Sequence, residues 1–293
     1  MINRQERPTC LTGEVRIIVK SVEVQGRGVI LLTGPSSCGK GEIAKALCRF
    51  LSIPAHRHLS MGSILRTTVS RAREDAVFRQ QLADEYGISD RVSILDRESN
   101  PPRLVQKAEE YRDDLAKFVS RAEGGQPSQL DWLEYCVTKG LLVPDDWTEK
   151  IITAVFTHSP ELRSTIFILD GYPRTTPAAR HLLQLLSDLE IPVIKAMHMA
   201  ITKEQMKVRA LNRGRLDDTE ESLERRYQFY IDRVQPCIDY LKDCLGSSAV
   251  ALIDGHQPVY NQDGELDLEG SIHAVVVSVM QALGLPGYLL EIR

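Results

Sequence analysis

Long hydrophobic runs are missing from this sequence, and so is the pattern of a membrane protein. No stretch approaches the roughly 18 consecutive apolar residues that a spanning helix needs, and the polar start, residues 1–8, does not resemble a signal peptide. A basic excess is also missing, because 36 Lys and Arg stand against 40 Asp and Glu for a net charge of -4. This balance argues against general nucleic-acid binding, although a few arginines could still hold a nucleotide. We therefore expect a cytoplasmic protein without nucleic acid or membrane among its partners.

Cysteine pairs are lacking as well. The six cysteines form no CxxC motif and show no metal-ligand spacing, which indicates reduced thiols in a cytosolic protein. The sequence has no internal repeat and no low-complexity tract. With 43% apolar and 26% charged residues, the 293-residue chain has the composition of an ordinary globular protein that can bury a core.

Short apolar runs predict the strands of a parallel sheet. Unalternated runs of Val, Ile and Leu suit strands that are covered on both faces. Helical segments lie between them, which predicts a doubly wound α/β core. The expected strands are residues 29–33, 55–59, 166–170, 192–200 and 249–254, and residues 15–24 could add one strand or hairpin arm before them.

Two helix starts fit the capping box, Thr202 with Gln205 and Asp218 with Glu221. Residues 71–128 form a polar, helical excursion, with a helix start at residues 100–102 and a stop at Gly124. Apolar side chains at spacings of three and four give this excursion one buried face, which we interpret as packing on a neighbouring helix rather than as a surface for a partner. They are Leu104, Ala108, Tyr111, Leu115, Phe118 and Ala122.

A glycine-rich segment, residues 34–41, follows the first expected strand and opens a helix over residues 42–51. Its small residues let backbone N–H groups wrap around phosphate oxygens at the positive end of that helix. Lys40 supplies a cation that can follow the charge as a phosphate moves. The flanking strand and helix make a chance glycine-rich turn the poorer interpretation. The residues are Gly34, Pro35, Ser36, Ser37, Cys38, Gly39, Lys40 and Gly41.

Two residues depart from the general pattern of such a phosphate loop. Gly41 stands where Ser or Thr is usual, and Glu42 would place a carboxylate near a bound phosphate. Glu42 could instead stabilise the first helical turn. Cys38 would lie beside the loop amides and Lys40, so we expect its thiol to be alkylated first and to be protected by bound ATP; burial of an inert thiol is the alternative.

Four further stretches follow in order: LSMGSILR at residues 59–66, GLLVPD at 140–145, ILDGYPRT at 168–175, and an arginine-rich segment at 209–226. Together with the phosphate loop and the tail IDGHQP at residues 253–258, they resemble the adenylate kinase family of nucleoside monophosphate kinases over residues 28–69 and 129–283. The resemblance implies a doubly wound five-stranded parallel sheet with an enlarged helical acceptor-binding lobe and a short lid.

The resemblance also implies a division of the chain. An N-terminal extension (1–27) would precede a P-loop core (28–59 and 146–293), with the acceptor lobe at residues 60–145 and its insertion at 71–128. The lid would span residues 209–218, and because only Gly214 separates Arg213 from Arg215, it would carry no zinc-bearing insertion.

The resemblance implies that ATP and a nucleoside monophosphate are the ligands of a monomeric enzyme with Mg²⁺ as cofactor. The catalytic residues would be Lys40, Asp170, Arg174, Arg215 and Arg226, and Asp170 would orient the hydration shell of Mg²⁺. Asp217 and Asp218 match an acidic pair at the lid hinge. The residues expected to bind ATP are Gly34, Ser36, Ser37, Cys38, Gly39, Lys40, Gly41, Glu42, Arg209, Arg213 and Gln257. Those expected to bind the acceptor are Ser60, Met61, Arg66, Val143, Gly171, Arg174 and Ala178.

Alternatives stay open for these residues and for the acceptor. Any one of the arginines could form a surface ion pair instead, and Asp170 could cap a strand end. Ala178, Met61 and Ser63 replace the family's glutamine, threonine and aspartate, so AMP is the first expectation and UMP, CMP or GMP remain candidates. A nucleotide-binding sensor with little turnover and a kinase of a small metabolite are the rival functions.

Overall fold

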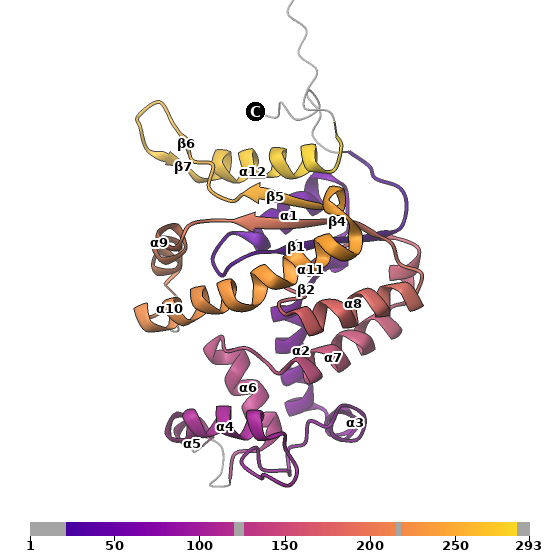
Figure 1. Ribbon diagram of the computed structural model, residues 1–293, viewed down its shortest axis with the longest axis vertical. Coiled ribbons are helices and arrows are strands. Elements are labelled where there is room, and N and C mark those ends of the chain that lie inside the picture. Colours follow the sequence, from indigo (N-terminus) through magenta and orange to yellow (C-terminus); the bar gives the residue numbers. More distant parts are fainter. Residues whose placement is uncertain (1–21, 120–125, 215–217, 286–293) are drawn as a thin grey trace, which may run out of the picture.

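The central sheet has five parallel strands in the order β2-β3-β1-β4-β5. They are β1 (Gly28–Thr33), β2 (His58–Ser60), β3 (Ile166–Asp170), β4 (Val193–Ala200) and β5 (Val250–Asp254). The computed structural model describes residues 22–119, 126–214 and 218–285 (Figure 1). The predicted five-stranded parallel sheet is confirmed. Since β1 is central and pairs Leu32 with Asp170 and Thr33 with His198, the ends of β3 and β4 lie beside the start of the phosphate loop.

Helices cover both faces of the sheet. The helices that form the core are α1 (Lys40–Phe50), α7 (Asp145–Thr157), α8 (Thr176–Asp188), α9 (Lys203–Arg213), α10 (Glu220–Phe229), α11 (Gln235–Leu245) and α12 (Leu268–Ala282). Ile30 and Leu32 of β1 pack toward α1 and α12, whereas Val29 and Leu31 pack toward α7, α8 and α11. The alternation along β1 therefore fixes which helices lie above and which lie below the sheet in Figure 1.

A second, helical lobe lies below the sheet in Figure 1. It comprises α2 (Met61–Glu74), α3 (Ala76–Tyr86), α4 (Pro102–Glu110), α5 (Arg112–Val119) and α6 (Gln129–Lys139). Tyr111, Trp132 and Tyr135 form its aromatic centre, with ring centroids about 6 Å apart. The predicted apolar face thus packs onto α6, as expected for a helix that covers its neighbour.

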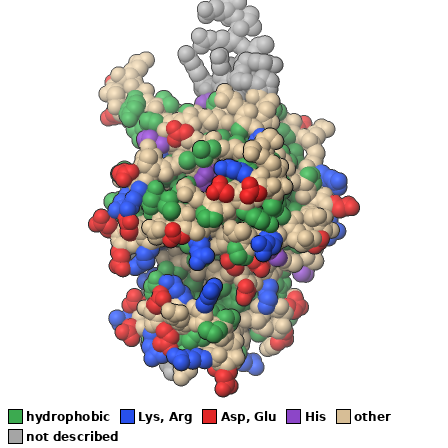
Figure 2. Space-filling model, viewed as in Figure 1, with side chains coloured by type: hydrophobic (Ala, Val, Ile, Leu, Met, Phe, Trp, Pro, Cys, Tyr) green, Lys and Arg blue, Asp and Glu red, His purple; other side chains and the backbone are tan. Residues whose placement is uncertain are grey.

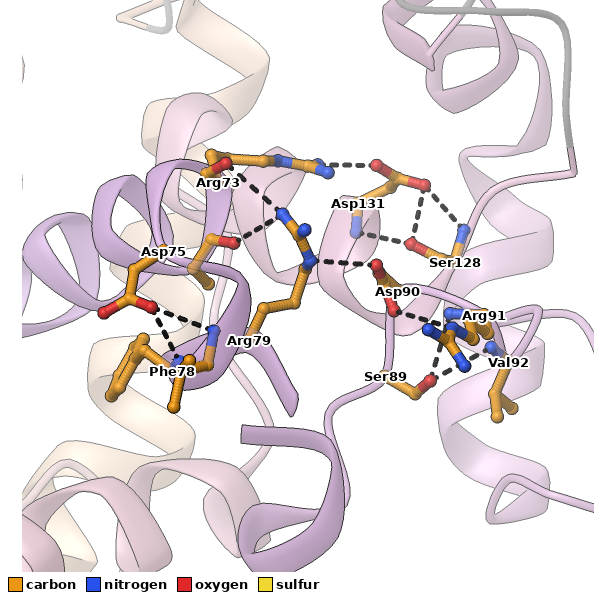
Figure 3. Close-up of polar contacts among 12 residues, drawn as sticks. Arg73, Asp75, Phe78, Arg79, Ser89, Asp90, Arg91, Val92, Ser128 and Asp131 are labelled. Atoms are coloured by element: carbon orange, nitrogen blue, oxygen red, sulfur yellow. Dashed lines mark hydrogen bonds and ion pairs between the residues drawn. The ribbon is translucent and has the colours of Figure 1, made fainter. Parts of the chain in front are cut away.

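Polar contacts tie this lobe together where its loops meet (Figure 3). Arg73 of α2 donates to Asp131 of α6 at 2.6 Å, and Asp131 closes the capping box of Ser128. Arg79 of α3 reaches Asp90 at 3.1 Å and the carbonyl oxygen of Ala72 at 3.1 Å. Since these contacts join segments far apart in sequence, the insertion is anchored on α2 and α6.

Four expectations about individual elements are wrong in part. The second strand begins at His58, because Pro54 starts a 3-10 turn over Ala55–Arg57. Thr219, not Asp218, caps α10 and accepts from the amide of Ser222. The helix expected from residue 100 leaves helical geometry at Tyr111, where φ is -113°, and its expected stop, Gly124, lies outside the described residues.

The fourth correction concerns the start of the chain. Residues 22–24 form no strand, and only the amide of Val22 donates to Phe50; the rest of the 15–24 segment lies outside the described residues. A hairpin that was not predicted, β6 (Val259–Tyr260) with β7 (Leu266–Asp267), precedes α12.

The surface in Figure 2 carries acidic and basic side chains interspersed over one face of the molecule. Within the described ranges, no helix combines the length and the apolar character that crossing a membrane requires. Anion recognition by this chain therefore has to come from a small number of cationic side chains at a particular site.

Candidate active site

The phosphate loop has the backbone geometry that its sequence predicts. Gly34 has φ 139°, and a Cβ at this position would collide with the carbonyl oxygen of Met199. Gly39 has φ 93° and is the residue that starts α1. Ser37 has φ 59°, and its buried hydroxyl has no partner among the described residues. Glycine is therefore required at positions 34 and 39. The loop presents its amides, and the Ser37 hydroxyl, to an anion.

Lys40 lies across the loop that it follows. Its Nζ donates to the carbonyl oxygens of Pro35 at 2.7 Å and Gly34 at 3.0 Å, and lies 3.4 Å from Sγ of Cys38. Neutral acceptors hold a cation less firmly than a carboxylate would. The ammonium group can therefore exchange these carbonyls for phosphate oxygens without breaking an ion pair among these contacts.

Asp170 ends β3 directly opposite the loop. Its Oδ1 is buried and has no hydrogen-bond partner in the described parts of the chain. Nε2 of His58 lies 3.6 Å from Oδ2, too far for a hydrogen bond. Across from the carboxylate, a Cβ on Gly41 would lie 4.0 Å from Oδ2. Because a buried carboxylate oxygen without a partner is unfavourable, this site favours a further ligand.

The segment after Asp170 places a guanidinium at the same edge. Gly171 has φ 78° and donates its amide to Leu32 at 3.1 Å, which ties the turn to β1. Arg174 Nε donates to the carbonyl oxygen of Gly171 at 2.9 Å. Burial lowers the pKa of this guanidinium; the charge of Asp170 opposes that shift and the charge of Arg226 adds to it. The peptide bond between Tyr172 and Pro173 in this turn is cis.

Thr175 joins this turn to the helical lobe. Its hydroxyl caps α8 by accepting from the amide of Ala178 and donates to the Asp145 carboxylate at 2.9 Å. Burial raises the pKa of Asp145, which this hydrogen bond opposes. The acceptor-side loops at residues 140–145 and 168–175 are therefore in direct contact.

Arg66 lies on the exposed side of α2, where it donates to Ser63 at 3.1 Å. It borders a cavity of about 300 Å³ between α2 and α6 that Val69, Ser70, Val137 and Thr138 also line. No contact in the described structure joins Arg66 to Arg174. The structure brings Arg174 to the phosphate loop, and it leaves Arg66 on the opposing lobe.

The other residues expected at the acceptor site are buried. Met61, Val143 and Ala178 expose 4%, 4% and 1% of their surface. Ser60 is at the end of β2, beside Asp170 in the sheet register. Of these four residues, only Ser60 lies at the carboxyl ends of the strands, where the phosphate loop begins. The other three present little surface to a base.

Arg209 of α9 contacts both the phosphate loop and the turn that follows β5. Its guanidinium donates to the carbonyl oxygens of Cys38 at 3.3 Å and Gly255 at 2.8 Å, and lies 3.2 Å from Nδ1 of His256. Gln257 follows in the same turn and donates to Ser278 of α12 at 2.9 Å. Arg209 therefore joins the phosphate loop to the turn after β5.

Arg226 of α10 forms a buried ion pair with Asp218 at 2.8 Å. This pair replaces the capping role predicted for Asp218. The side chain of Arg213, and Arg215 and Asp217 entirely, lie outside what the structure describes. Of the four arginines expected around the donor and the transferring group, the structure therefore describes the side chains of Arg209 and Arg226.

Two expectations about the phosphate loop can be compared with the structure. Glu42 has an exposed carboxylate that pairs with Lys45 at 2.9 Å, which agrees with the alternative that it stabilises the first turn of α1, and its contact with ATP stays a prediction. Cys38, expected to be alkylated first, exposes only 1% of its surface, whereas Cys244 is exposed. Among the described cysteines the accessible thiol is therefore Cys244, because Cys38 packs into the apolar cluster beneath the loop.

Sequence reasoning missed a buried polar cluster behind the loop. His198 of β4 lies 2.9 Å from the hydroxyl of Thr33 and 2.9 Å from that of Tyr230. Burial, reinforced by the charge of Lys40, lowers the pKa of His198 to about 4, so the imidazole is neutral. A lone histidine inside an apolar strand was the available signal.

A parallel sheet whose central strand enters a glycine-rich loop, with a lysine in the loop and arginines around it, defines the class of P-loop phosphotransferases. Comparison with known proteins narrows the class. The family model described as adenylate kinase matches residues 121–245. The adenylate kinases of Corynebacterium urealyticum and a Cyanothece species are 25% and 26% identical to this chain, over 72% and 84% of its length and 84% and 94% of theirs. That of Corynebacterium glutamicum is 32% identical over 126 residues, which cover 43% of this chain and 68% of the relative.

The chain belongs to the adenylate kinase family, and it is a phosphotransferase of the nucleoside monophosphate kinase type.

Proposed function

We propose that this protein transfers the γ-phosphate of ATP to a nucleoside monophosphate, with AMP as the first candidate, and releases ADP and a nucleoside diphosphate. The observation that carries the proposal is the buried carboxylate of Asp170, whose Oδ1 has no partner among the described residues and whose Oδ2 lies across from Gly41 of the phosphate loop. The charges of Asp170 and Arg174 act on each other, and Lys40 lies across the same loop. The donor would lie in the loop between α1 and α9, and the acceptor between this edge and the lobe of residues 60–145.

Mg²⁺ fits the residues at this position. The buried carboxylate oxygen of Asp170 without a partner is an oxygen ligand of the kind that this cation prefers, and Gly41 opposite the carboxylate adds no side chain. Asp170 would orient the water shell of the ion, and the Ser37 hydroxyl is a second oxygen without a partner among the described residues. When bound, Mg²⁺ would neutralise charge on the phosphates of ATP.

No general base is needed, because the attacking phosphate oxygen of the acceptor is already ionised. The work left to the protein is to align two anions and offset their repulsion. Lys40 would move from the loop carbonyls to the phosphate, Arg174 and Arg66 would hold the acceptor phosphate, and Arg226 would face the transferring group. Approach of the two lobes would exclude water.

In this proposal, the residues that recognise the acceptor base differ from those of AMP-selective relatives. Ala178 and Met61 are buried and offer no polar group to the edge of a base. The cavity beside Arg66, which two valines, two hydroxyl side chains and the charged Arg73, Glu74 and Glu134 line, is the accessible alternative. The pairing of Glu42 with Lys45 partly offsets a charge that would favour a protein with little turnover.

A coupled kinase assay with Mg²⁺-ATP over AMP, UMP, CMP and GMP tests the proposal. We expect turnover with at least one of them, and a loss of about 100-fold or more in kcat for Lys40→Met because that contact strengthens in the transition state. Arg49→Met, which changes an exposed basic residue in the last turn of the same helix, is the matched control and should retain activity. Phosphate transfer to none of the four would overturn the proposal.

A further inference from the structure

Three buried polar side chains form what we call the polar bridge: Thr33, His198 and Tyr230. Each exposes 5% of its surface or less. His198 Nδ1 lies 2.9 Å from Thr33 Oγ1, and its Nε2 lies 2.9 Å from the Tyr230 hydroxyl. The imidazole and phenol rings stack at 5.7 Å with an interplanar angle of 3°. Both ring nitrogens are therefore satisfied by a neutral histidine, which has one donor and one acceptor.

One end of the polar bridge is the entrance of the phosphate loop. Thr33 is the last residue of β1 and precedes Gly34. The next residue of β4 after His198 is Met199, whose carbonyl oxygen lies against Gly34. The charge of Lys40 contributes to the lowered pKa of His198, which places the ammonium group within electrostatic range of the ring. A displacement of His198 would therefore also displace the residues at the start of the phosphate loop.

The other end is the helix that carries Arg226. Tyr230 follows Arg226 by four residues, about one helical turn, and so lies on the same side of the helix. Tyr230 also starts the π-helical turn Tyr230–Val234 that connects α10 with α11. Such turns interrupt the regular spacing of a helix and often occur at functional sites. The hydroxyl of Tyr230 thus fixes α10 at the point where its register changes.

We propose that His198 is a positioning residue for phosphate transfer: it holds α10 against the end of β1 so that Arg226 faces the phosphate loop. The proposal rests on the roles of Lys40 and Arg226 in the function proposed above. Three fully bonded polar groups in a core specify one arrangement more sharply than apolar groups would, because every alternative leaves a buried group unpaired. His198 itself touches no substrate in this proposal.

A double-mutant cycle between His198 and Arg226 tests it. His198→Phe keeps a ring of similar size for stacking and removes both nitrogens. We expect this variant to lower kcat about 10-fold while the KM values for both substrates change less than about 2-fold, as for a contact that acts on the transition state. In an Arg226→Ala background the same change should have almost no further effect. Equal fold-losses in the two backgrounds would overturn the proposal.

Two more variants separate the halves of the polar bridge. Tyr230→Phe removes a single oxygen and tests the α10 side even if His198→Phe folds poorly. His198→Gln places an amide near the position of Nε2 and should restore most of the lost kcat by keeping the bond to Tyr230. A glutamine variant as slow as the phenylalanine variant would contradict the proposal. Tyr240→Phe on α11 is the matched control and should leave kcat unchanged.

Hydrogen exchange supplies a readout without turnover. We expect the amides of α10 to exchange faster in Tyr230→Phe than in the wild type, with α12 unchanged. If the wild type transfers no phosphate to any acceptor, the proposed function fails while this measurement still tests the polar bridge. Unchanged exchange in α10 would overturn the inference by itself.

Discussion

Arg66 and Arg174 come from different parts of the fold, the helical lobe and the turn after β3. Arg174 is attached to the turn after β3 through Gly171, and Arg66 projects from α2. Two planar guanidinium groups approaching from two sides suit bidentate contacts with one phosphate. We therefore expect Arg66→Ala and Arg174→Ala to weaken acceptor binding at least about 10-fold more than ATP binding.

Separate titrations of ATP and of the monophosphate measure these affinities. Arg71→Ala is the control, since Arg71 lies on the same helix as Arg66, pairs with Asp75 directly after that helix and stacks on Phe78. Equal losses of affinity for the two ligands would show that the acceptor site is elsewhere.

Cys244 and Cys38 differ in exposure, and this sets their reactivity. The Cys244 thiol is exposed near the end of α11, whereas Cys38 is buried under the phosphate loop. A reagent reaches a buried thiol only after the surrounding segment opens. Among the described cysteines, we expect brief alkylation to modify Cys244 first, without loss of activity, and bound ATP to leave that rate unchanged. Mass spectrometry of digests decides it, and modification of Cys38 before Cys244 would be the contrary result.

At the scale of elements, α9 depends on the residue that caps its start. The Thr202 hydroxyl accepts from the amide of Gln205, and Oε1 of Gln205 accepts from the amide of Thr202, so the predicted capping box is confirmed. Loss of such a cap destabilises a protein by about 1 kcal/mol. We expect Thr202→Ala to lower the free energy of unfolding by that amount, whereas Thr202→Ser should retain most of it. Urea unfolding measures the difference, and an alanine variant as stable as the wild type would contradict the prediction.

Elements with a strong local signal could be predicted from sequence. The phosphate loop is specified by glycines that alone tolerate its backbone angles, and the strands by their apolar runs. The start of β2 could not be predicted, because a 3-10 turn and a strand share short apolar stretches. Thr219 and Asp218 are both good N-caps, and the choice between them depends on the ion pair with Arg226.

The sequence predicts the part of the candidate site at the phosphate loop better than the rest of it. Lys40, Asp170 and Arg174 lie at or after the ends of neighbouring strands, and parallel strands end on the same side of a sheet. Burial, in contrast, is a property of the whole fold, so Cys38 and Ala178 could not be recognised as inaccessible. A glutamine at Ala178 would have to fit where 1% of the surface is exposed, and it would overpack the core.

For the whole molecule, the buried neutral His198 makes stability depend on pH. Its pKa is lowered from 6.5 to about 4, chiefly by burial. The unfolded chain therefore binds a proton below pH 6.5 that the folded protein does not accept until about pH 4. The contribution is fully present above pH 6.5 and is lost as the pH falls toward 4.

Between pH 7 and pH 5 this loss should reach about 2 kcal/mol. We expect the free energy of unfolding of the wild type to fall by that much more than that of His198→Gln over this interval, since glutamine does not titrate. Urea titrations of the two proteins at both pH values give the difference. An identical fall in both would mean that His198 carries no such proton linkage.

The helical excursion at residues 71–128 lies between β2 and its sheet partner β3, where His58 pairs with Ile168. It about doubles the length of chain that must close before these two strands meet. Loop-closure entropy grows only with the logarithm of length, so this doubling opposes folding by about 0.6 kcal/mol. The folding rate is affected more than the free energy of unfolding, because pairing of strands far apart in the sequence raises the contact order. As β2 is an edge strand, we expect the inner strands β3, β1 and β4 to associate before it, so that the acceptor-side edge of the sheet is completed late in folding.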